Sequence, residues 1–210
     1  ELEASLRRMN TDYLDLWLVH AVKSAADVDN RVDGDVVDAM LEFQQQGLVR
    51  HLGFSGHRHS SAHRRLMERV AGKDPFAVAQ LPVNAVDATK RDSFVRELLP
   101  DLVARGYGVF GMKTLAHGRF FQQNSDNFVT NDPVIPNHIS LEEALWFALA
   151  QPITALVSGT DKVEQVTENV GVVKRFADLS EDDQDEITLK VAQFHNTPGL
   201  EYYRPRPGTY

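Results

Sequence analysis

Apolar and polar positions along the chain form one unit that repeats: an amphipathic helix, a glycine at its end, and a short apolar run. Each run is bounded by turn residues, which is typical of a buried strand. The pattern predicts five strands, at residues 16–19, 48–54, 76–80, 108–112 and 154–157. It predicts helices at residues 1–9, 33–46, 61–71, 91–104, 141–150, 162–175 and 180–194, with a loop at 21–32.

The helix ends carry recognisable signals. Gly47, Gly72 and Gly106 follow predicted helices at the position where a left-handed residue is favoured. Ser140 and Glu143 have the spacing of a capping box, in which each side chain satisfies the other's backbone N–H. These signals support the helix boundaries that the periodicity predicts.

Strands that alternate with helices indicate right-handed crossovers and a parallel sheet. No GxGxxG segment follows any strand, which counts against a Rossmann domain. A (β/α)8 TIM barrel fits better, although that fold needs eight strands and the pattern supplies five. We therefore expect an α/β chain with a partial barrel over residues 1–195 and a C-terminal tail over 196–210. Because the first residues resemble the middle of a helix and lack a Met, we expect that upstream strands are missing.

Composition narrows the classes of function. With 42% hydrophobic and 25% charged residues, the chain has the profile of a soluble globular domain, and it has no apolar run of membrane-spanning length. A formal charge of -8 argues against a nucleic-acid partner, since phosphate neutralisation needs a basic face. The absence of Cys excludes disulfides, thiolate nucleophiles and Cys-ligated metals within this chain. It fits a reducing compartment, and we expect a cytoplasmic protein.

His20 is the first candidate for chemistry. It stands at the carboxyl end of the first predicted strand, the end where barrel enzymes place their active sites. An imidazole there could donate to a substrate carbonyl or exchange a proton near neutral pH. The alternative is a histidine that simply bonds the backbone of its own loop.

Five segments in chain order resemble motifs of the aldo-keto reductase family. The first is Arg8 to His20, similar to RLGTDYxDLxxxH, and the second is Gly47 to Ser55, similar to GKIRxIGxS. Gln80 with Val83-Asn84 resembles QxxYN, and Gly111 to Gly118 resembles the MKPLGxG branch. Residues 158–169 resemble PGxxxxxQxxEN. Together the matches cover roughly residues 1–175.

The resemblance implies a role for residues near the nicotinamide. His20 would be the catalytic histidine that orients and polarises the substrate carbonyl. Ser55 and Gln80 would bond the nicotinamide carboxamide, and Met112 would pack on the ring where many members place Tyr. Lys113, Leu115 and Gly118 would lie along the pyrophosphate.

The last motif would hold the other end of the nucleotide. Gly159, Thr160 and Lys162 precede a helix, where N–H groups can bind a phosphate, although a plain helix start explains them as well. Gln165 and Asn169 share one helical face, and by resemblance they hold the adenine together with Glu168.

Some positions depart from the family pattern. Gly56 stands where most members have Asn, which puts one carboxamide contact in doubt. Gln165 stands where many NADP-specific members have Arg, and Asp161 adds negative charge, whereas Lys162 partly restores a site for the 2′-phosphate. NADP(H) stays favoured over NAD(H).

The resemblance implies an NAD(P)H-dependent oxidoreductase that reduces a small aldehyde or ketone. In the family, an Asp, a general-acid Tyr and a Lys come from the first three βα units, which this chain lacks. We therefore expect this chain to be inactive as a reductase by itself. One alternative is a non-catalytic nucleotide-binding barrel that acts as a sensor or regulatory subunit; another is a barrel completed by a partner or a swapped protomer.

Two other groups of residues have plainer interpretations. His59 and His63 are four residues apart, but we expect no metal site and interpret them as solvated histidines at a helix start. Phe120, Phe121 and Phe128 follow the fourth strand and could form a lid or pocket wall, or pin the loop to the barrel.

Overall fold

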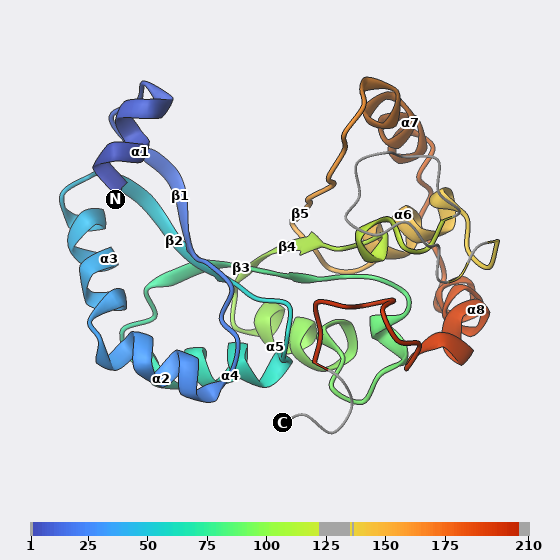
Figure 1. The fold of residues 1–210 in the computed structure, drawn as a ribbon, viewed down its shortest axis with the longest axis horizontal. Helices are drawn as coiled ribbons and strands as arrows, with labels where there is room; N and C mark the ends of the chain where they lie inside the picture. The colour runs from blue at the N-terminus through green and yellow to red at the C-terminus, as the bar shows by residue number, and fades with distance from the viewer. Residues whose placement is uncertain (1, 122–134, 136, 206–210) are drawn as a thin grey trace.

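The computed structural model describes residues 2–121, 135 and 137–205, and its centre is a five-stranded parallel sheet (Figure 1). The strands pair in chain order, from β1 to β5. This confirms the predicted α/β architecture of a partial barrel. The strands are β1 (Leu14–Val19), β2 (Val49–Ser55), β3 (Phe76–Pro82), β4 (Gly108–Met112) and β5 (Ala155–Leu156).

Helices connect the strands in the order that parallel crossovers require. The three predicted glycine stops have the left-handed φ of a helix C-terminus, 77°, 91° and 81° for Gly47, Gly72 and Gly106. The helices are α1 (Leu2–Met9), α2 (Ala25–Asp33), α3 (Val36–Gln45), α4 (Ser60–Arg69), α5 (Leu99–Ala104), α6 (Leu141–Leu149), α7 (Val163–Lys174) and α8 (Glu181–Val191). Shorter helical turns are η1 (Asp87–Thr89), η2 (Phe94–Leu98), η3 (Ala116–Gly118) and η4 (Ala192–Phe194).

The segment after β1 corrects the sequence prediction. In place of a loop at 21–32 and one helix at 33–46, two helices form, α2 and α3, with Gly34 between them. Ser24 starts the first of them, because its hydroxyl accepts the Asp27 N–H at 3.2 Å. The helix predicted from residue 91 begins only at Phe94, after Ser93, whose hydroxyl accepts the Arg96 N–H at 2.9 Å. The Ser140–Glu143 capping box is confirmed, with bonds of 3.1 and 2.7 Å.

One face of the sheet packs against helices and forms the core. Leu52, Phe54 and Leu81 on this face are fully buried. The ring of Phe54 lies 5.3 Å from that of Phe76, and Trp17 meets Phe43 of α3 at 5.8 Å, edge to face. Dense packing of this kind is the main source of stability that the fold has.

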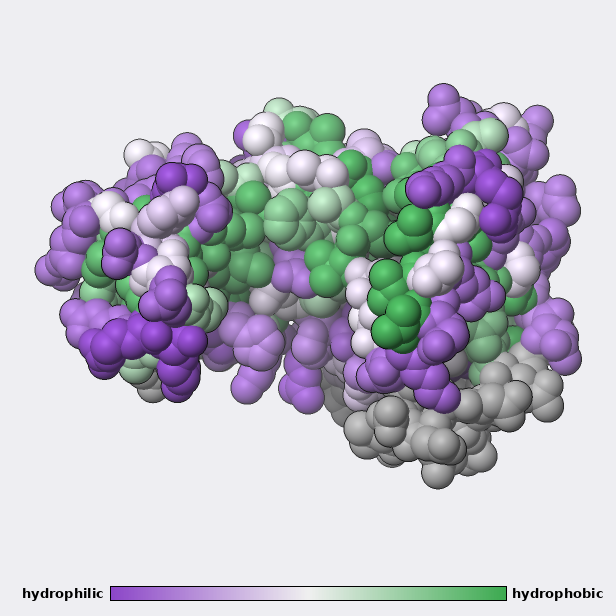
Figure 2. Space-filling view, turned by 90° about the horizontal axis from the view of Figure 1, so that it is seen from above, coloured by the Kyte–Doolittle hydropathy of each residue, from purple (hydrophilic) through white to green (hydrophobic). Residues whose placement is uncertain are grey.

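The opposite face of the sheet has less cover. Pairing places Leu18, Gly53, Val78 and Gly108 in register on this face, and Leu18 and Val78 stay half-buried. Figure 2 shows a hydrophobic band across the molecule on the side away from α2 to α5. Among the described residues, β1 and β5 each have a neighbour on one side only. In this part of the chain the barrel is therefore open between β1 and β5.

Candidate functional site

His20 lies where the sequence predicts it, directly after β1 at the carboxyl end of the sheet. Its side chain is exposed, while the backbone around it is fixed by several bonds. The N–H groups of Ala21 and Val22 donate to Ser55 Oγ at 3.1 Å and to the Ser55 carbonyl at 2.7 Å. Arg31 donates to the His20 carbonyl at 2.9 Å. A rigid loop therefore presents an accessible imidazole.

Ser55 and Gln80 are neighbours at the carboxyl ends of β2 and β3, where their Cα positions pair. Ser55 is 5% exposed, and its hydroxyl also approaches the Val19 carbonyl at 3.5 Å. The Gln80 side chain is half-buried, and its backbone carbonyl accepts the Gly56 N–H at 3.2 Å. Gln80 thus has more of its amide available to a ligand than Ser55 has of its hydroxyl.

Gly56 is explained by close packing. A Cβ at this position would lie 2.6 Å from His63 Cε1 and 2.7 Å from the Val22 carbonyl oxygen. Both distances are below normal van der Waals contact, and the second obstacle is backbone. The Asn that most members of the resembled family carry here would therefore not fit this loop.

Met112 ends β4, and the loop that follows it gathers positive charge. Lys113 has a left-handed φ of 58°, and its Nζ lies 3.0 Å from His117 Nδ1. Burial lowers the pKa of Lys113. Burial, then the charges of Lys113 and Arg119, lower the pKa of His117, while Asp161 acts in the opposite direction. We call residues 113–119, which include the predicted Leu115 and Gly118, the cationic loop.

His57 also lies near the predicted site residues, although the sequence analysis assigns it no role. Burial lowers its pKa first, followed by the charges of Lys113 and His20. His57 therefore lies within electrostatic reach of both predicted site residues. Its position two residues after Ser55, at the end of a strand, was the signal available in the sequence.

The second group of predicted residues lies at the start of α7. Gln165 Oε1 accepts the N–H groups of Asp161 and Lys162, at 2.8 and 3.2 Å, so this side chain caps the helix. Asn169 Nδ2 donates to Ser158 Oγ at 3.0 Å. Gly159, Thr160, Lys162 and Glu168 are exposed.

An apolar cleft of about 420 Å³ adjoins this second group. Its polar lining comes from Ser158, Thr160, Asn169 and Lys174. Its apolar walls come from α6, β5 and α7: Leu145, Leu149, Leu156, Val166, Val170 and Val173. A flat, largely apolar group with a few polar edges would suit such walls.

Of the two histidines interpreted as solvated at the start of α4, His59 is half-buried directly before the helix, and His63 corrects the interpretation. His63 is fully buried, and its ring packs 5.5 Å from Phe54 and 5.3 Å from Phe94. Burial lowers its pKa to about 4. Within the described ranges, no three His, Cys, Asp or Glu side chains gather in a way that could hold a metal ion.

The phenylalanine-rich segment after β4 divides into two parts. Phe120 is fully buried and Phe121 packs partly against the core, which fits a loop pinned to the barrel. Phe128 lies outside the described residues.

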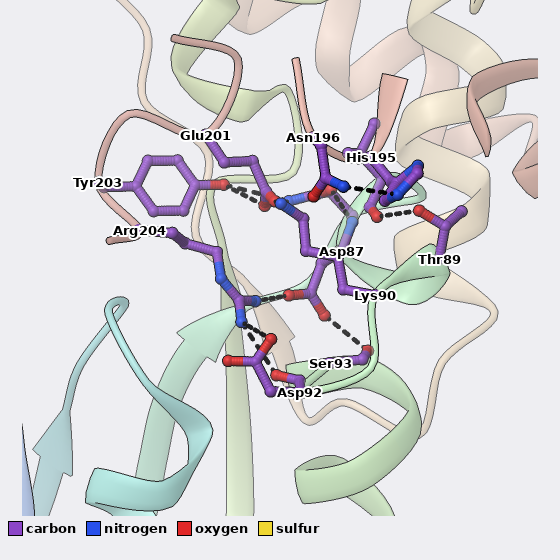
Figure 3. A network of polar contacts seen from close by, with 12 residues as sticks. Asp87, Thr89, Lys90, Asp92, Ser93, His195, Asn196, Glu201, Tyr203 and Arg204 are labelled. Atoms are coloured by element: carbon purple, nitrogen blue, oxygen red, sulfur yellow. Dashed lines mark hydrogen bonds and ion pairs between the residues drawn. The ribbon is translucent and has the colours of Figure 1, made fainter. Parts of the chain in front are cut away.

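A buried polar network joins the C-terminal segment to the loop after β3 (Figure 3). Asp87 accepts the Ser93 hydroxyl at 2.8 Å and the Val95 N–H at 2.9 Å, and it pairs with Arg204. Burial raises the pKa of Asp87 to about 7, against the opposing effect of Arg204. Sequence reasoning missed this network, because it joins residues more than 100 positions apart.

None of the helices in the described ranges combines the length and apolar character needed to cross a bilayer.

Comparison with known proteins identifies the family. The model of the aldo/keto reductase family matches residues 1–137, more than half of the chain. The chain belongs to the aldo/keto reductase family. Among curated relatives, it is 25% identical over 186 residues to the uncharacterized oxidoreductase YqkF of Bacillus subtilis. It is 23% identical over 197 residues to L-galactose dehydrogenase of Arabidopsis thaliana.

Solved aldo/keto reductases share the fold. The holo form of aldo-keto reductase AKR11C1 from Bacillus halodurans superposes with a TM-score of 0.68 at 21% identity, covering 90% of this chain and 62% of that one. The two curated relatives align over 80% and 87% of this chain but over only 58% and 60% of their own lengths. The solved aldo-keto reductases have the (β/α)8 barrel, of which the described residues of this chain form five strands.

Proposed function

We propose that this chain carries the nucleotide-binding part of an NAD(P)H-dependent oxidoreductase that reduces an aldehyde or a ketone. Family membership supports the class of reaction. The observation that carries the proposal is that four predicted site residues lie at or next to the carboxyl ends of four neighbouring strands: His20, Ser55, Gln80 and Met112. The cationic loop follows directly after Met112.

The residues present fit a nicotinamide nucleotide. The Gln80 amide both donates and accepts, as a carboxamide requires. Lys113 and Arg119 are cations, and His117 can become one, so the loop offers several partners for phosphate oxygens. The charge of Asp161 acts on His117, which indicates that the start of α7 lies near the cationic loop. The cleft beside Ser158, Thr160 and Asn169 could receive the adenine.

When bound, the cofactor would supply a hydride to the carbonyl carbon of the substrate. His20 would donate a hydrogen bond to the carbonyl oxygen, with its backbone already held by Ser55 and Arg31. The proton would come from the Tyr that the family places in an earlier βα unit. For that reason we expect this chain to bind the nucleotide without turning it over.

NADP(H) remains the favoured form. Lys162 is exposed beside Gly159 and Thr160, where it could meet a 2′-phosphate. Asp161 opposes such a site, so we expect a modest preference for NADPH over NADH.

Fluorescence titration of the 210-residue chain with NADPH and with NADH tests the proposal. We expect binding of both nucleotides, and Gln80→Ala should weaken both about tenfold, the equivalent of one or two lost hydrogen bonds. Gln44→Ala is the matched control, since the Gln44 amide donates to the Arg50 carbonyl on the surface, away from the carboxyl ends of the strands. Absence of binding by the unmodified chain, or an unchanged affinity in Gln80→Ala, would contradict the proposal.

A further inference from the structure

The segment Leu200 to Arg204 turns back from α8 to the carboxyl ends of the central strands (Figure 1). Four of its five residues are buried, and Tyr202 is 50% exposed. Charged and hydroxylated residues at this depth are stable only with partners. The partners come from two places, the loop after β3 and the cationic loop.

Arg204 forms the first anchor. Its guanidinium pairs with the fully buried carboxylate of Asp87 and bonds both the carbonyl and the carboxylate of Asp92, at 3.0 and 2.7 Å (Figure 3). A planar guanidinium that meets two carboxylates fixes direction as well as position. The end of the segment is thereby held at one place on the loop after β3.

Glu201 forms the second anchor. One of its oxygens accepts the Asn84 amide at 3.0 Å and the Tyr203 hydroxyl at 2.8 Å, and the other pairs with Lys90 at 2.8 Å. Asn84 also donates to the Lys113 carbonyl at 3.4 Å. The anchor is therefore linked directly to the backbone at the start of the cationic loop.

Between the anchors, the two tyrosines contact the cations of that loop. Lys113 Nζ lies 5.5 Å from the centre of the Tyr203 ring, and the Arg119 guanidinium lies 4.8 Å from that of Tyr202. The Tyr202 hydroxyl is 2.9 Å from His117 Nδ1, the same atom that Lys113 approaches at 3.0 Å. Because an ammonium can only donate, this nitrogen is the acceptor, which agrees with the lowered pKa of His117.

We propose that residues 200–204 are a strap that positions Lys113, His117 and Arg119 for the phosphates of a bound nucleotide. The identity of the ligand rests on the proposed function, whereas the contacts between residues 200–204 and the cationic loop do not. Long cationic side chains lose rotamer freedom when they bind, and a side chain that is already held loses less. Tyr202 is accordingly a positioning residue, which acts through His117 and Arg119.

Tyr202→Ala tests the strap. Because Tyr202 is exposed, we expect this substitution to leave the fold intact. Without ligand, we expect faster hydrogen–deuterium exchange at residues 113–119, and we expect NADPH to bind about five- to tenfold more weakly. Tyr13→Ala is a matched control, because Tyr13 is also exposed and also carries an arginine, Arg50, over its ring. It should change neither measurement.

Tyr202→Phe separates positioning from packing. It keeps the ring for Arg119 and removes the hydroxyl from His117, so the pKa of His117 should rise in an NMR titration. The charged neighbours that also act on His117, namely Lys113, Arg119 and Asp161, are unchanged in this variant.

Unchanged exchange at 113–119 in Tyr202→Ala, or an unchanged pKa of His117 in Tyr202→Phe, would overturn the strap. Failure of the unmodified chain to bind NADPH, with the exchange and NMR changes present, would instead overturn the proposed nucleotide function and leave the positioning contacts supported.

Discussion

The centre of the sheet and its β5 edge differ in how completely their apolar surface is buried. Around β2 and β3, helix α4 buries Ala62, Leu66 and Met67, and the face of the sheet that packs against it is buried as well. Around β5, helix α7 has an apolar stripe at 163, 166, 170 and 173, yet these valines are between 43% and 76% exposed. Figure 1 shows α7 standing apart from the helices that cover the central strands.

The difference shows that helical periodicity and burial are separate properties. The spacing of the α7 valines is that of a helix face that packs against something. Within the described ranges nothing covers that face fully, and β5 is only two residues long. At the centre of the sheet even charged groups are buried, because the strap supplies them with partners. Energetic effects of mutation should therefore be concentrated around β2 to β4.

The largest effect should come from Arg204→Met, which leaves the buried carboxyl group of Asp87 without its cation. We expect a loss of about 3–5 kcal/mol in the free energy of unfolding, because this carboxyl must then either stay charged in the core without a partner or take up a proton. Urea denaturation of the variant measures it. The double variant Asp87→Asn/Arg204→Met should lose clearly less than the sum of the single changes. Strict additivity would show that the two groups do not stabilise each other.

Truncation of one apolar side chain in each of the two regions makes the comparison direct. Leu66→Ala on α4 should cost about 2–5 kcal/mol, since Leu66 is 1% exposed and its removal leaves a cavity. Val170→Ala on α7 should stay within about 0.5 kcal/mol, as expected for a partly exposed position. Chemical denaturation of the two variants side by side gives both values. A cost at Val170 approaching that at Leu66 would mean that the α7 face is covered in solution.

Sequence reasoning was most successful where the signals are local. The five strands, the glycine stops and the Ser140–Glu143 cap follow from spacing within a few residues, and the structure has them all. It failed at α2, where the Ser24 cap starts a helix inside a segment that was predicted to be a loop.

The candidate site was predicted only in part, for a similar reason. His20, Ser55, Gln80 and Met112 reach the strand ends as expected, because the end of a strand can be read from the chain; their roles stay predictions. His57, Tyr202 and Tyr203 join the site through tertiary contacts that no local pattern encodes. The burial of His63 was not predicted for the same reason, since the aromatic residues that surround it come from β2 and η2.

A last, pH-dependent effect tests whether water reaches the buried ring of His63. His63 has a folded pKa of about 4 against an ordinary value of 6.5, so the unfolded chain binds the proton more readily. Its contribution to stability is complete above pH 6.5 and is lost as the pH falls toward 4. Between pH 7 and pH 5 we expect His63 alone to reduce the free energy of unfolding by about 1–2 kcal/mol. Urea denaturation across this range should show a smaller slope in His63→Gln than in the unmodified chain. The exposed His51→Gln should keep the original slope, and equal slopes in all three proteins would mean that water reaches the His63 ring.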